Sequence, residues 1–159
     1  MKRKTILLQI VVVIIGIGVL AFMLFEPHIE GRNVNATLFQ IYFNDPFLIY
    51  AYTASIAFFV AIYKTFKLLG YIGQNKAFSM DSVKALQAIR GCAITIIVFI
   101  LGAEVYLSIF QRTKDDIAGG VFIGLCIILI SGVISIATSV FEKILQDGIE
   151  IETERNIMQ

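Results

Sequence analysis

The chain has 159 residues, of which 58% are hydrophobic and 16% are charged, and its formal net charge at pH 7 is +1. A soluble domain is closer to about 45–50% apolar and about 25% charged, so this composition excludes an ordinary soluble core and favours a lipid bilayer as the solvent. The near-zero net charge gives no indication of a nucleic-acid partner, and only the distribution of charge is informative.

The first two predicted membrane spans are residues 6–25 and 46–69. The first is an apolar run of about 20 residues, long enough to cross roughly 30 Å of hydrocarbon, and Glu26-Pro27 ends it. It is too long for the apolar part of a signal peptide, and no small-residue cleavage site follows, so we expect a retained helix. Asp45 can cap the second span, where Pro46 at the first helical position sacrifices no hydrogen bond.

A polar segment with a helix-start signal precedes the third predicted span, residues 91–110. Ser79 is a good N-cap for a helix that begins at Met80. In residues 80–90, apolar side chains recur every three residues and polar ones occupy another side, which predicts an amphipathic helix. No proline or polar loop separates this helix from the third span. We therefore expect one continuous helix whose first turns lie at the inner membrane interface.

The fourth predicted span, residues 118–141, carries no charge, and an acidic tail, residues 142–159, follows it. We expect the tail to continue the helix beyond the membrane. Small residues form a stripe along this span: Gly120, Gly124, Ser131, Ser135 and Ser139. Such a stripe lets two helix backbones approach closely in lipid. We expect it to pack against another span of the same chain, and a contact between two copies is the alternative.

Together these segments predict a single all-α domain, an integral membrane four-helix bundle, because a membrane span must satisfy its backbone hydrogen bonds internally. Its orientation follows from the 13 basic residues, which are enriched on the cytoplasmic side of membrane proteins. Placing both termini in the cytoplasm puts ten inside: Lys2, Arg3, Lys4, Lys64, Lys67, Lys76, Lys84, Arg90, Lys143 and Arg155. Only Arg32, Arg112 and Lys114 then lie outside. We therefore expect both termini to be cytoplasmic.

Glu104 is the only charged residue of the third span. An ionisable group in a membrane segment is by default a candidate functional site, because placing it in hydrocarbon is costly. Glu104 could bind a cation, relay a proton, or pair with Arg112 or Lys114. Interfacial water or a bond to a neighbouring helix would also account for it. No other span holds an acidic residue, whereas a proton path usually needs several.

No sequence motif indicates catalysis. The chain has no G-x-S-x-G, no H-E-x-x-H and no phosphate-binding glycine loop, and His28 is its only histidine. Cys92 and Cys126 lie in separate apolar runs, where cysteine acts as a small hydrophobe. We therefore expect no enzyme, no metal site and no cofactor.

Several motifs are similar to those of a known family. They are M-K-R-K-T (Met1 to Thr5), A-I-Y-K-T-F-K-L-L (Ala61 to Leu69), N-K-A-F-S (Asn75 to Ser79), S-V-K-A-L-Q-A-I (Ser82 to Ile89) and E-I-E-T-E-R-N (Glu150 to Asn156). The chain resembles a family of small bacterial four-span membrane proteins, domain of unknown function 2975, often described as YoaS-like. This resemblance implies a multi-pass protein of the bacterial cytoplasmic (inner) membrane, often encoded beside a small helix-turn-helix regulator. It supplies no activity, ligand or catalytic residue.

Two hypotheses of function follow. In the first, Lys84, Gln87 and Arg90 and the acidic tail form a cytoplasmic face that docks a protein such as a small helix-turn-helix regulator, with no direct contact to nucleic acid. The chain would then be an accessory, sensor or immunity-type interaction protein. In the second, it is a small transporter or a lipid- or ion-binding bundle that uses Glu104. Membrane lipids are expected partners in both, and self-association stays open.

Overall fold

The computed structural model describes residues 2–29, 46–110 and 118–158, and every regular element in these ranges is an α-helix. The helices are α1 (Lys2–Ile29), α3 (Pro46–Gly73), α4 (Met80–Phe110) and α5 (Ala118–Ile157). The predicted all-α class is confirmed. The helix from Met80 runs unbroken into the third span, and the fourth span continues into the tail, as the sequence predicts.

All four helices are long and apolar enough to cross a membrane. In the most apolar stretch of each helix, at most 11% of the residues are buried inside the molecule. Many large apolar side chains along these helices are instead exposed, and Ile17, Phe22 and Leu129 are each more than 60% exposed. Water would penalise this arrangement, whereas lipid tails solvate it. The chain is therefore a membrane protein with four spans.

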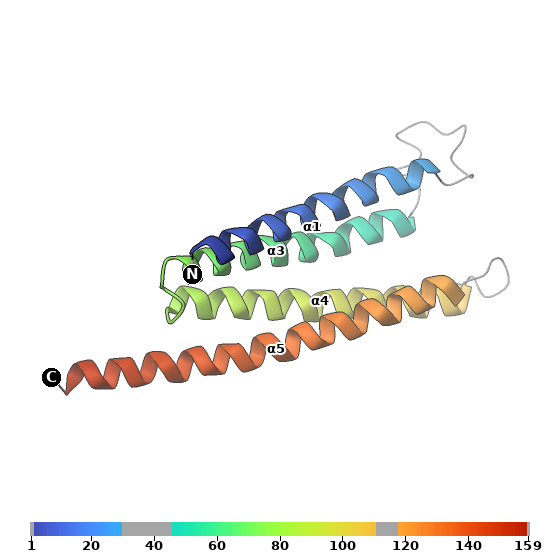
Figure 1. Cartoon of the computed structure of the whole chain (residues 1–159). Helices are drawn as coiled ribbons and strands as arrows, with labels where there is room; N and C mark the ends of the chain where they lie inside the picture. The colour runs from blue at the N-terminus through green and yellow to red at the C-terminus, as the bar shows by residue number, and fades with distance from the viewer. Residues whose placement is uncertain (1, 30–45, 111–117, 159) are drawn as a thin grey trace.

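The helices pack in chain order (Figure 1). α1 lies against α3, α3 against α4, and α4 against α5, with the most extensive contact in the last pair. Among the described residues, no extensive contact joins α1 to α5, so the bundle is an open row of antiparallel neighbours. Both termini lie at the same end of the molecule (Figure 1). That this end faces the cytoplasm stays a prediction.

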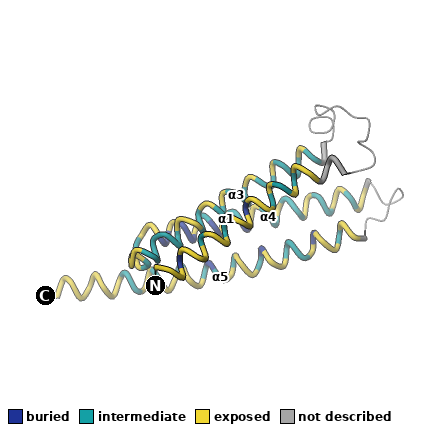
Figure 2. The backbone as a smooth tube through the Cα atoms, turned by 45° about the horizontal axis from the view of Figure 1, so that its top comes forward, coloured by how far each residue is buried: buried dark blue, intermediate teal, exposed yellow. Residues whose placement is uncertain are grey.

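The buried core lies in the first half of α4, where this helix is held between α3 and α5 (Figure 2). Its buried apolar residues are Val83, Ala85, Leu86, Ile89 and Ala93. The three- and four-residue steps between most of them place their side chains on adjoining faces of the helix. The amphipathic segment predicted to lie at the membrane interface therefore packs its apolar side against the rest of the chain.

α1 approaches α3 closely through small residues. A Cβ added at Gly16 would lie 3.3 Å from Cγ2 of Ile62, and one added at Gly73 would lie 3.3 Å from Cγ2 of the buried Thr5. Helices in lipid associate through such close backbone contacts, because lipid tails provide no hydrophobic driving force between apolar surfaces. Glycine at these two positions therefore determines how near α1 comes to α3.

Candidate functional site

The connection between α3 and α4, residues 74–79, begins with a Schellman motif. The backbone N–H of Lys76 donates to the carbonyl of Tyr71 over 2.9 Å, and that of Asn75 donates to the carbonyl of Ile72 over 3.2 Å. Asn75 has a φ of 61°, a left-handed conformation that asparagine tolerates better than most residues. The first residue of the N-K-A-F-S motif therefore ends α3.

The last residue of that motif begins α4. The hydroxyl of Ser79 accepts a hydrogen bond from the backbone N–H of Ser82 over 3.3 Å, which is the geometry of an N-cap. Ser82 is fully buried, and its own hydroxyl donates to the carbonyl of Lys76 over 3.2 Å. Ser79 thus caps the first turn of α4, and Ser82 links that turn to the connecting segment. Asp45, the other predicted cap, lies outside the described residues.

Phe78, within the same motif, lies against α5. Its ring atoms Cδ1 and Cε1 would both be 2.7 Å from a Cβ placed on Gly148. Any larger residue at position 148 would push the ring away, so the absence of a side chain at Gly148 allows Phe78 to pack against α5. The short connection therefore contacts the beginning of the tail, at the end of the molecule where both termini lie.

Glu142 of α5 joins two of the three predicted docking residues. Its Oε1 accepts a hydrogen bond from Nε2 of Gln87 over 2.7 Å, and its Oε2 lies 3.5 Å from an Nη of Arg90. Nε2 of Gln146 also donates to Oε1 over 3.4 Å. The side chain of Glu142 is only 13% exposed, against 45% for Arg90. Gln87 and Arg90 thus bind α5 of their own chain, whereas Lys84 is exposed on the outer side of α4.

Glu104 faces α5, and the structure leaves half of its carboxylate unpaired. A Cβ added at Gly124 would overlap Oε1 of Glu104 and lie 2.9 Å from its carboxyl carbon, so the carboxylate rests directly on the glycine. The other oxygen, Oε2, is buried and has no hydrogen-bond partner among the described residues. A buried polar atom without a partner is costly. Glu104 therefore needs a proton, an ion, a water molecule or a partner group at this place.

The small-residue stripe of the fourth span turns toward α4. Gly124 and Ser131 are buried, Ser135 and Ser139 are half-buried, and Gly120 is exposed. A Cβ at Gly124 would also meet Cγ2 of Ile100 at 3.3 Å, so this part of the stripe lies against α4. Since α4 is the only helix with extensive described contacts to α5, the buried members pack within the chain.

Other polar groups of the spans hold neighbouring helices together. The hydroxyl of Tyr50 donates to the carbonyl of Phe99 over 2.7 Å, which joins α3 to α4. The hydroxyl of Tyr52 donates to the carbonyl of Met23 over 2.8 Å, which joins α3 to α1. Each bond uses a spare lone pair of a carbonyl in the helix, so the helical backbone stays intact.

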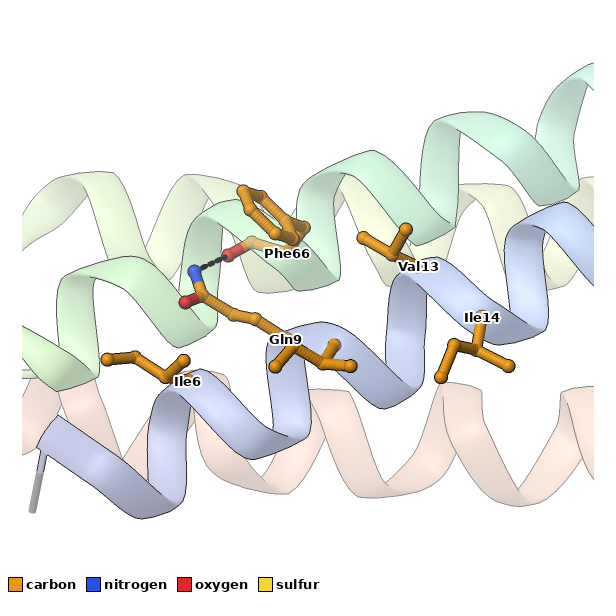
Figure 3. A pocket seen from close by; sticks show the side chains of 6 residues that line it. Ile6, Gln9, Val13, Ile14 and Phe66 are labelled. Carbon is orange, nitrogen blue, oxygen red and sulfur yellow. Dashed lines mark hydrogen bonds between the residues drawn. The ribbon is translucent and has the colours of Figure 1, made fainter.

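A shallow hollow of about 300 Å³ opens between α1 and α3 (Figure 3). Its lining residues are Ile6, Gln9, Ile10, Val13, Ile14 and Phe66. Gln9 is the one polar side chain in this wall, and its Nε2 donates to the carbonyl of Phe66 over 3.1 Å. The wall therefore offers apolar surface of the kind that lipid acyl chains cover, with the amide of Gln9 used to hold α1 against α3.

Several of these positions were not predicted from the sequence as site residues. Glu142 appeared only as one acid of the tail, and its pairing with α4 depends on how two distant segments align. Gly148 carried only a weak signal, because a glycine within a helix is compatible with a close approach but Gly132 of the same helix meets nothing within 4 Å. Within the described part of the chain, no group of three or more His, Cys, Asp or Glu residues could hold a metal ion.

Comparisons with known proteins agree with the motifs of the sequence. The family model described as "Protein of unknown function (DUF2975)" matches residues 33–157. The "Uncharacterized membrane protein YoaS" of Bacillus subtilis (strain 168) is 40% identical over 159 residues, covering 98% of each chain. No solved structure matches. Neither description gives an enzymatic activity. The resemblance is thereby confirmed, and the chain belongs to the DUF2975 family, alongside a membrane protein from Bacillus.

Proposed function

We propose that this chain is a non-enzymatic interaction protein of the bacterial cytoplasmic membrane, which docks a partner protein at the end of the bundle that carries both termini. One observation carries the proposal: α5 continues past the other helices (Figure 1). Near the start of the projecting part, the ring of Phe78 lies against Gly148. Every residue from Glu150 to Met158 is exposed.

The projecting segment carries apolar side chains that the rest of the chain does not cover. The nine residues from Ile149 to Ile157 rise about 14 Å as a helix. Its exposed side chains include Ile151, Ile157 and Met158, each at least 67% exposed. Exposed apolar side chains beside charged ones are typical of surfaces that bind other proteins.

The structure changes which residues of the predicted docking face are available. Gln87 and Arg90 contact Glu142, so substituting them would loosen α5 as well as alter the surface. Lys84 and the projecting end of α5 are also exposed. Substitutions there would alter the surface without removing a contact to Glu142. The proposed docking face therefore consists of residues 150–158 of α5, and Lys84, exposed on α4, is a separate candidate position.

The proposal is tested by affinity capture from native membranes after mild crosslinking. Wild type is compared with a chain ending at Ile149, with Lys84→Glu, and with a chain ending at Met158 as the matched control, which keeps residues 150–158. We expect the first truncation to lose a crosslinked partner that wild type and the control retain, at equal protein levels in the membrane. Capture of the same proteins by all four chains, or of none by wild type, would contradict the proposal.

Glu104 supports a second candidate, a transporter or an ion-binding bundle, because its Oε2 is buried and unpaired among the described residues. The test is the flux of protons, Na⁺ and K⁺ into proteoliposomes. If the candidate is right, wild type carries one of these ions and Glu104→Gln abolishes the flux, while Glu104→Asp keeps part of it. Equal flux in wild type and Glu104→Gln, or none in wild type, would remove this candidate.

A further inference from the structure

Two parallel stripes run along α5 from Ile144 into the projecting segment, on the side of the helix opposite Glu142, which contacts α4. Ile144, Ile151 and Met158 form an apolar stripe, since residues seven apart differ by only about 20° around a helix. Asp147, Glu150 and Glu154 form an acidic stripe beside it. All six side chains are exposed. Gly148, on the adjoining side, faces Phe78 of the connection.

From these stripes we propose that the end of α5 binds a basic amphipathic helix of another protein, two to three turns long. The inference rests on the proposed function and specifies its partner. Apolar side chains of the partner would cover the apolar stripe, and its lysine or arginine side chains would face the acidic stripe. Residues 147–155 hold four acidic side chains and one basic side chain, Arg155. This part of α5 therefore attracts a positively charged partner.

Charge also decides between this occupant and two others. A second copy of the chain would bring an identical acidic stripe against this one, and like charges facing each other oppose association. Anionic lipid headgroups would be repelled in the same way. Lys143 lies one turn nearer the membrane than Asp147 and offsets only the beginning of the stripe. A basic partner helix is the occupant that satisfies both stripes together.

The test uses the full chain in nanodiscs of phosphatidylcholine, with empty nanodiscs as the blank, and three synthetic peptides of equal length. The first is a basic amphipathic helix, the second carries the same apolar face with acidic residues, and the third is a scrambled form of the first. Binding is measured by fluorescence anisotropy. We expect the basic amphipathic peptide to bind and the other two to bind far more weakly.

Matched variants locate the surface. Glu154→Lys lies in the acidic stripe, and Glu152→Lys makes the same change of charge on nearly the opposite side of the helix. We expect Glu154→Lys and Ile151→Ser each to weaken binding about threefold to tenfold and Glu152→Lys to have a smaller effect. Equal losses in both lysine variants, no binding of the basic peptide, or equal binding of the acidic peptide would overturn the inference.

Two results separate this inference from the proposed function. A partner that is captured from membranes and lost on truncation, together with no binding of the basic peptide, would refute the basic helix and leave the docking function standing. Efficient crosslinking between two copies through Ile151→Cys would identify a second copy as the occupant and would also overturn the inference.

Discussion

Gly124 and Glu104 form a matched pair in the α4–α5 contact, near the end of α4 and the beginning of α5. The carboxylate of Glu104 occupies the space where a side chain at position 124 would begin. A small residue in a transmembrane helix usually brings two backbones together. Here it also leaves room for an ionisable group that would otherwise hold α4 and α5 apart. The sequence showed each residue separately, as the charge of one span and part of the small-residue stripe of another.

This pairing predicts the outcome of a double-mutant cycle. Gly124→Ala should lower the free energy of unfolding by about 1 to 3 kcal/mol, because the added methyl group overlaps the Glu104 carboxylate. In a Glu104→Ala background the same change should cost much less. Unfolding is followed by circular dichroism in detergent micelles. Gly132→Ala is the control, since a Cβ there meets nothing within 4 Å. An equal loss at position 124 in both backgrounds would contradict the pairing.

At the scale of the elements, local sequence is enough for each helix and insufficient for their contacts. The apolar runs and Ser79 predict four helices and the start of α4, because hydropathy, periodicity and capping act over a few residues. The bonds from Gln87 and Arg90 to Glu142 join residues 55 and 52 positions apart. Their existence depends on how far α5 slides along α4, which no local pattern encodes. Two of the three residues predicted to dock a partner, Gln87 and Arg90, therefore also hold α4 to α5 within the chain.

The N-K-A-F-S connection shows how one short motif can coordinate three helices. Asn75 ends α3, Ser79 begins α4, and Phe78 rests on Gly148 of α5. Each residue type meets a separate requirement: a left-handed backbone, a capping oxygen and an aromatic surface. In the sequence the motif is marked by its resemblance to a family pattern, and the structure gives its members physical roles. The projecting part of α5 starts directly after this contact, so the connection also fixes where that segment leaves the bundle.

At the scale of the whole molecule, every proposal for the docking face depends on the orientation of the chain. The distribution of the 13 basic residues predicts that both termini are cytoplasmic. An opposite orientation would place ten of them outside and would present the end of α5 to the exterior. The acidic and apolar stripes would be unchanged, but a cytoplasmic partner could not reach them.

Cysteine labelling decides the orientation. In a background with Cys92→Ala and Cys126→Ala, single cysteines are placed at Glu152 in the tail and at Lys114 between the last two spans. A membrane-impermeant maleimide should label Lys114→Cys in intact cells and should label Glu152→Cys only after the membrane is permeabilised. The reverse pattern would show that the rule of basic residues fails for this chain. It would rule out a cytoplasmic partner and direct the search to proteins outside the membrane, because both stripes of α5 would then face them.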